Sequence, residues 1–206
     1  MRKIFCFGDS NIYGFNPKNG SRFDKNSRWS GILQTILGAD YEVIEAGCNN
    51  RTAFSINPAG KMMTGIQILP ELLKSDFDIV VLAIGINDLQ VAYNVDISTF
   101  DVGLQELINI VKKQSPNAEI LLIAPSVINK NILNSYFATL FDEKSIEKSY
   151  CLGEIYKKIA QKNSCEFLNF EDIAKVSKID GLHYEKDEHE KIARVIANLL
   201  SSKKDF

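Results

Sequence analysis

Three separate segments of the sequence contain polar residues of types that can act together in catalysis: a serine, an asparagine, and an aspartate with a histidine. Ser10 follows a Gly-Asp pair directly after an apolar run. His183 lies three residues after Asp180, so the carboxylate can accept the imidazole Nδ1–H and leave Nε2 to take the serine proton. The Asn87 side chain offers an N–H₂ group that, with backbone amides, can stabilise a tetrahedral oxyanion. This set of residue types indicates acyl-transfer chemistry, which needs no metal and no cofactor.

Elements that could bring these residues together follow from the hydrophobic pattern. Short apolar or β-branched runs alternate with longer helical periods, which predicts an α/β fold with a five-stranded parallel sheet and helices on both faces. The strands are predicted at 3–7, 41–45, 78–84, 119–124 and 165–168, and the helices at 28–37, within 61–74, and at 98–113, 142–162 and 187–201. We expect Asn26 or Ser27 to cap the first helix, Gly38 to end it, and Pro70 to limit the second.

Ligand sites in such folds lie at the carboxyl ends of the strands, near the point where the strand order reverses. The segments directly after the first three predicted strands contain Ser10, Asn50 and Asn87, and the loop after the fifth strand contains Asp180 and His183. We therefore expect all of them at one edge of the sheet.

Length and composition favour a single domain over residues 1–206. The 24 basic and 26 acidic residues give a net charge of −2, so no strong field favours nucleic acid or a membrane surface as a partner. The apolar runs are too short to span a bilayer, and the start of the sequence resembles a first strand rather than an export signal, which predicts a cytoplasmic protein. The four cysteines are scattered, and Cys6 is expected to be a buried thiol.

Three blocks of the sequence resemble those of the SGNH/GDSL hydrolases, the GDSL-like lipases and acylhydrolases. They are Phe7-Gly8-Asp9-Ser10-Asn11, Gly85-Ile86-Asn87-Asp88 and Asp180-Gly181-Leu182-His183. The segments 28–31, 37–40 and 42–45 resemble the arylesterase and acyltransferase branch. The resemblance implies a flavodoxin-like three-layer α/β/α sandwich, with Ser10 as nucleophile, His183 as base and Asp180 as its partner. It also implies an oxyanion hole formed by the Asn87 side chain and the Ser10 amide.

One block departs from the family pattern. Where the family usually has a glycine whose amide is the third oxyanion donor, this sequence has Asn50, ahead of Arg51-Thr52. Gly47 matches the earlier glycine of that block. This difference affects the expected backbone geometry and pocket size, but not the expected class of reaction. Asn50 is expected to contribute its backbone N–H to the oxyanion hole.

The substrate is not fixed by these motifs. A serine esterase that hydrolyses or transfers short-to-medium acyl groups is the leading hypothesis, with a carbohydrate O-deacetylase and a non-catalytic binding module as alternatives. Asn11, Tyr13, Phe15 and Phe54 flank the motifs and are predicted to line the substrate pocket.

Three further expectations concern residues around the site. The apolar segment 126–149 is predicted to form a lid or a contact between subunits of a homo-oligomer. His189 is interpreted as a solvated surface histidine, because Glu185 and Glu190 lie near it in the sequence. Arg51 is expected to pair with a carboxylate.

Overall fold

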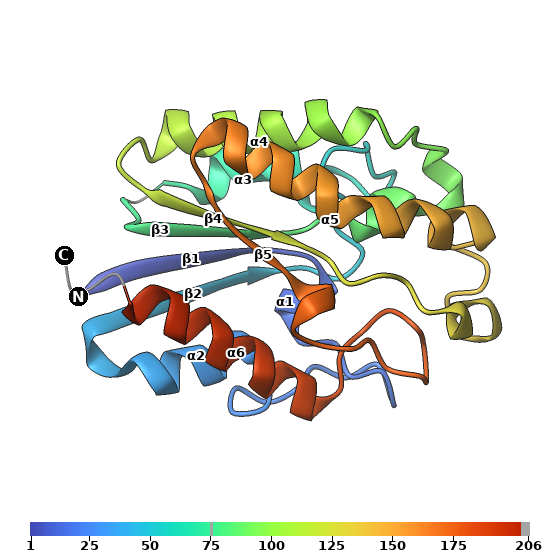
Figure 1. The fold of residues 1–206 in the computed structure, drawn as a ribbon, viewed down its shortest axis with the longest axis horizontal. Coiled ribbons are helices and arrows are strands. Elements are labelled where there is room, and N and C mark those ends of the chain that lie inside the picture. Colours follow the sequence, from blue (N-terminus) through green and yellow to red (C-terminus); the bar gives the residue numbers. More distant parts are fainter. Residues whose placement is uncertain (75, 203–206) are drawn as a thin grey trace.

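A five-stranded parallel sheet lies between two layers of helices in the computed structural model of this chain, which describes residues 1–74 and 76–202 (Figure 1). The strands are β1 (Arg2–Gly8), β2 (Tyr41–Gly47), β3 (Ile79–Ala83), β4 (Glu119–Ala124) and β5 (Glu166–Asn169). The α-helices are α1 (Ser10–Tyr13), α2 (Trp29–Leu37), α3 (Gly65–Leu72), α4 (Thr99–Gln114), α5 (Glu143–Asn163) and α6 (Lys186–Ser201). The predicted α/β class and the flavodoxin-like three-layer arrangement are confirmed.

The strand order is β2-β1-β3-β4-β5, so the direction of winding reverses between β1 and β3. These two strands are paired in register, with Gly8 opposite Ala83 at their carboxyl ends. The reversal leaves a crevice between the loops that follow the two strands, which is where α/β proteins bind ligands.

Two apolar cores hold the sheet between its helices. Alternate residues of a strand point to opposite faces. In β1, Phe5 and Phe7 accordingly contact the core beneath α3, α4 and α5, whereas Ile4 and Cys6 contact the core beneath α2 and α6. Cys6 is fully buried as expected, and burial raises the pKa of its thiol.

The predicted start of α5 is confirmed, whereas the predicted cap of α2 is wrong. Helix α5 begins as expected, because Asp142 and Ser145 form a reciprocal capping box. Neither Asn26 nor Ser27 caps α2, whose first N–H, that of Trp29, donates instead to the Nδ1 atom of the distant His189 (3.3 Å).

The proline expected to limit the second helix lies within it. Pro70 is inside α3, near the carboxyl end of the helix, and α3 ends two residues later at Leu72. A proline lacks the N–H that continues a helix, so its place in the last turn is consistent with an early end.

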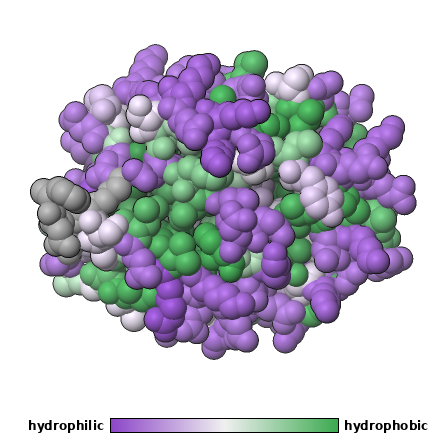
Figure 2. Space-filling view, viewed as in Figure 1, coloured by the Kyte–Doolittle hydropathy of each residue, from purple (hydrophilic) through white to green (hydrophobic). Residues whose placement is uncertain are grey.

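Polar side chains cover most of the face seen in Figure 2, and apolar surface gathers near the edge strand β5. The four residues of β5 are all half-buried. None of the helices within residues 1–74 and 76–202 combines the length and the apolar character that crossing a membrane requires.

Candidate active site

The turn from β1 into the short helix α1 presents Ser10 at the reversal point of the sheet. Sequence reasoning missed α1, which has only four residues. Asp9 caps it by accepting the Asn11 N–H (2.9 Å), and burial raises the pKa of Asp9 to about 7. Only a glycine fits before this turn, because a Cβ atom at Gly8 would lie 2.0 Å from the Ala83 carbonyl oxygen. The hydroxyl of Ser10 is thus held at the end of two paired strands.

Ser10, His183 and Asp180 form one hydrogen-bonded chain. The His183 Nε2 atom lies 2.8 Å from the Ser10 Oγ atom, and its Nδ1 atom lies 2.7 Å from the Asp180 Oδ2 atom. With the ring proton on Nδ1 and donated to Asp180, Nε2 accepts the serine O–H. All three side chains are buried.

The Asp180 carboxylate is fixed by its own loop. Its second oxygen, Oδ1, accepts the backbone N–H groups of Leu182 and His183, both at 3.0 Å. Burial acts to raise the pKa of Asp180, but the hydrogen bonds from the His183 ring and from these N–H groups outweigh it and hold the pKa below its usual range. Asp180 is therefore an ionised partner for the imidazole.

The three residues expected to supply oxyanion N–H donors line one cavity. The cavity described below is lined by Ser10, Asn50 and Asn87. Within the described residues, the backbone N–H groups of Ser10 and Asn50 have no hydrogen-bond partner. The Asn87 Nδ2 atom donates one hydrogen to the Arg51 carbonyl (3.1 Å) and keeps the other. Asn50 has a φ of +60°, the left-handed conformation that asparagine tolerates better than most residues.

Buried charges hold the loops that contain these donors. Asp88 accepts the backbone N–H groups of three successive residues, 53 to 55, so it joins the loop after β3 to the loop after β2. Among the described residues, no carboxylate lies within ion-pair distance of the Arg51 guanidinium, although, against the larger effect of burial, the charge of Asp9 acts to raise the pKa of Arg51. Its guanidinium donates to the carbonyls of Gly8, Ala46 and Met62 and lies over the Phe7 ring.

A cavity of about 90 Å³ opens beside the Ser10 hydroxyl. Its polar wall contains four carboxamide side chains, and its apolar wall consists of aromatic and leucine side chains. The lining residues other than Ser10 and His183 are Asn49, Asn50, Asn87, Gln90, Phe15, Phe137, Leu140, Phe141 and Leu182. Gln90 was not identified as a site residue from the sequence. Its only signal in the sequence is its position three residues after Asn87.

One of the four predicted pocket residues lines this cavity, and three do not. Phe15 is in the wall, with its ring 4.2 Å from the His183 ring. Tyr13 lies instead beneath the Arg22 guanidinium, and Phe54 packs edge-on against Phe100 beside α4. Asn11 is buried behind the cavity wall: its side chain donates to the carbonyl of Leu182, and its own carbonyl accepts the Trp29 indole N–H.

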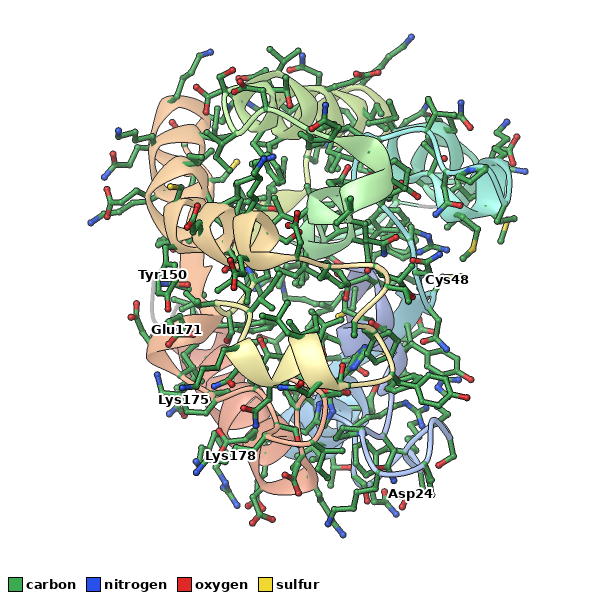
Figure 3. The ribbon with its side chains drawn as sticks, turned by 90° about the vertical axis from the view of Figure 1, so that its right-hand side faces the viewer. Asp24, Cys48, Tyr150, Glu171, Lys175 and Lys178 are labelled. Carbon is green, nitrogen blue, oxygen red and sulfur yellow. The ribbon has the colours of Figure 1, made fainter. Side chains whose placement is uncertain are left out.

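The segment 126–149 contributes both to the core and to the cavity. Ile128, Ile132 and Phe141 are buried in the core beneath α5. Phe137 contacts both Phe15 and His183, at ring distances of 5.9 and 5.3 Å. Figure 3 faces the edge where the strands end, and the yellow part of this segment lies in front, between the labelled Cys48 and Tyr150. A role in opening the site or in oligomerisation stays a prediction.

His189 is not a surface residue. Its side chain is fully buried between the rings of Phe23 and Tyr184, and burial lowers its pKa to about 3. It accepts the Trp29 N–H through Nδ1, so the neutral ring carries its proton on Nε2. Among the described residues, no group of three or more histidine, cysteine or carboxylate side chains is placed to hold a metal ion.

The chain resembles known proteins over most of its length. A profile of the GDSL-like Lipase/Acylhydrolase family matches residues 6–189. Est24, a carbohydrate acetylesterase from Sinorhizobium meliloti, is 27% identical, with a TM-score of 0.91 over 98% of this chain and 99% of that chain. The inhibitor-bound aryl esterase of M. smegmatis is 25% identical, with a TM-score of 0.90 over the same shares. No match is found among curated proteins.

Proposed function

The chain belongs to the GDSL-like lipase/acylhydrolase family, and from this premise we propose that it is a serine esterase that cleaves short acyl esters. The family and the esterases among the similar structures support a hydrolase of the ester class. The observation that carries the finer proposal is the hydrogen-bonded chain of Ser10, His183 and Asp180, which lies beside a cavity lined by Asn50 and Asn87.

The reaction follows from the roles that these groups suit. Ser10 Oγ attacks the ester carbonyl carbon while His183 Nε2 takes its proton. The oxygen of the tetrahedral intermediate accepts hydrogen bonds from the N–H groups of Ser10 and Asn50 and from Asn87 Nδ2. The imidazolium then gives its proton to the departing alcohol. Water, activated by the same imidazole, attacks the acyl-enzyme and releases the acid.

The cavity beside Ser10 favours a small acyl group. Its volume of about 90 Å³ is well below the ~150 Å³ of an apolar cavity that takes up benzene. An acetyl or propionyl group therefore suits it better than an aromatic acyl group. A second cavity, of about 650 Å³, adjoins it and shares Phe15 and Phe137 as a wall.

A carbohydrate O-deacetylase is the second candidate, because the larger cavity also presents neutral polar side chains, Asn19 and Asn134. A sugar that bears an acetyl ester would place its hydroxyl groups near such hydrogen-bonding partners. Transfer of the acyl group to an alcohol uses the same acyl-enzyme, with the alcohol in place of water. We propose hydrolysis as the main reaction and transfer as a side reaction that added alcohol increases.

Replacing the nucleophile tests the proposal. Ser10→Ala is expected to lose hydrolysis of p-nitrophenyl acetate and covalent labelling by a fluorophosphonate, with the fold intact by circular dichroism. Ser98→Ala, at an exposed serine outside the three motifs and the cavity wall, serves as the matched control and should keep both. A folded Ser10→Ala protein that still hydrolyses the ester at the wild-type rate would contradict the mechanism. Labelling of neither protein would favour the non-catalytic binding module.

A further inference from the structure

A buried glutamine joins the two asparagines that stand beside the serine. Gln90 follows the 3₁₀ helix Ile86–Leu89, and its side chain is almost fully buried. Its Nε2 atom donates to Asn50 Oδ1 at 2.7 Å and to Asn87 Oδ1 at 3.0 Å. A carboxamide has two N–H donors, so both are used on the two asparagines.

These bonds decide which way the Asn87 carboxamide faces. With Oδ1 turned to Gln90, the Nδ2 group lies on the opposite side, where it donates to the Arg51 carbonyl and keeps one hydrogen for the cavity. A flipped Asn87 would place its N–H₂ against the N–H₂ of Gln90. Two facing donors leave buried hydrogens without acceptors, which disfavours the flipped orientation.

The same glutamine anchors Asn50 from its side-chain end. The Asn50 carbonyl accepts the Asn57 side-chain N–H₂ at 3.0 Å, while its Oδ1 accepts from Gln90 at 2.7 Å. Asn50 is therefore held in its left-handed conformation by two hydrogen bonds, one to its backbone carbonyl and one to its side chain. A glycine at position 50 would adopt that conformation as easily, but it would offer no side-chain acceptor to Gln90.

We propose that Gln90 is a positioning residue that sets the orientation of two oxyanion donors on separate loops, the Asn50 N–H after β2 and the Asn87 Nδ2 after β3. The inference rests on the proposed esterase function. In this site the asparagine at position 50 and the glutamine at position 90 act as a pair: the side chain that replaces the family's usual glycine receives the bond that Gln90 donates.

Gln90→Met tests this, because methionine has a similar length and no hydrogen-bond donor. Losing an oxyanion donor outright costs ~10²–10³ in kcat, and a misplacement of about 1 Å can cost ~10². Since both donors remain but are less firmly held, we expect kcat for p-nitrophenyl acetate to fall by about 10- to 100-fold with little change in KM.

The chain offers a matched control in Gln105. Its Nε2 atom also bridges two asparagine oxygens, those of Asn109 and Asn163, but on the outer side of α4. Gln105→Met removes these two bonds and a third, in which Asn163 Nδ2 donates to Gln105 Oε1 (2.9 Å). Because Gln105 does not line the cavity, the variant should keep kcat within about 2-fold of wild type. Thermal unfolding of both variants separates loss of stability from loss of turnover.

A double-mutant cycle with Asn87→Ala separates positioning from a merely structural role. If Gln90 acts through Asn87, Gln90→Met should reduce kcat much less in the Asn87→Ala background than in wild type. The same fold-loss in both backgrounds, or a kcat for Gln90→Met equal to that of Gln105→Met, would overturn the inference. Should Gln90→Met not fold, Gln90→Glu carries the test. Its carboxylate faces both Oδ1 atoms and forces Asn87 to flip, so a near-normal kcat would overturn the inference.

The proposed function can fail separately from this inference. If Ser10→Ala is inactive and Gln90→Met is as active as wild type, only the role of Gln90 is wrong. If Ser10→Ala hydrolyses the ester normally, there is no oxyanion hole at this place to position, and both proposals are overturned.

Discussion

The buried histidine at position 189 should make the fold sensitive to mild acid. In the folded protein its pKa is lowered to about 3, because burial disfavours the charged ring, whereas an unfolded chain protonates it near ~6.5. Between pH ~6.5 and about 3, His189 is therefore protonated in the unfolded chain but stays neutral in the folded protein. The histidine's contribution to stability is therefore complete above pH ~6.5 and is lost as the pH falls toward about 3.

The size of this effect follows from the two pKa values. Each pH unit between them is worth ~1.4 kcal/mol, so at pH 5 the loss is about 2 kcal/mol relative to pH 7.5. That is a large part of a typical stability of ~5–15 kcal/mol. The ring is fully buried, so screening by solvent does not reduce the effect.

His189→Asn is the informative change, because an asparagine Oδ1 can replace Nδ1 as the acceptor of the Trp29 N–H. The variant loses packing against Phe23 and Tyr184 and should be less stable at every pH. Its decline between pH 7.5 and pH 5, measured by urea unfolding, should nevertheless be about 2 kcal/mol smaller than that of wild type. An equal decline in both proteins would show that His189 is protonated in the folded state or is exposed to solvent.

Two further changes test the cavity and its donors. Asn87→Ala should lower kcat by ~10²–10³ with a modest change in KM, whereas Asn50→Gly keeps its backbone N–H and should lose less; steady-state kinetics that show the reverse order would contradict the assignment of donors. Phe137→Ala should join the two cavities and raise kcat/KM for octanoyl over acetyl esters by about 10-fold or more. Tyr150→Ala, at an α5 residue that is 68% exposed and lines neither cavity, is its control, and an unchanged chain-length profile in Phe137→Ala would show that the acyl chain lies elsewhere.

The strands and the meeting of the motifs could be predicted because each depends on a simple rule. Apolar runs such as that of β3 are covered on both faces, and a parallel sheet must bring the ends of its strands to one edge. Ser10, Asn87 and His183 therefore came together as their positions implied. Their catalytic roles stay predictions until the variants are measured.

The residues that could not be predicted depend on neighbours distant in the sequence. The charged residues near His189 on its own helix suggested that its side chain is exposed to solvent. In the folded chain the Phe23 ring and the start of α2 at Trp29 cover it. Phe54 follows a motif and yet fills the space above Gly103, where a Cβ atom would lie 2.1 Å from its ring. Gln90 belongs to no motif, and its role depends on two loops that meet only in the folded chain.

The separation along the chain of Ser10 and His183, the proposed nucleophile and base, also has a consequence for folding. Ser10 and His183 are 173 residues apart, yet their side chains are within hydrogen-bond distance. A chain that ends before His183 contains the proposed nucleophile but lacks the proposed base. Contacts that close long loops form more slowly than local structure, so we expect the hydrogen bond between the two side chains to form late in folding. The appearance of esterase activity during refolding is thus a direct measure of completed assembly and should lag behind the recovery of helical signal.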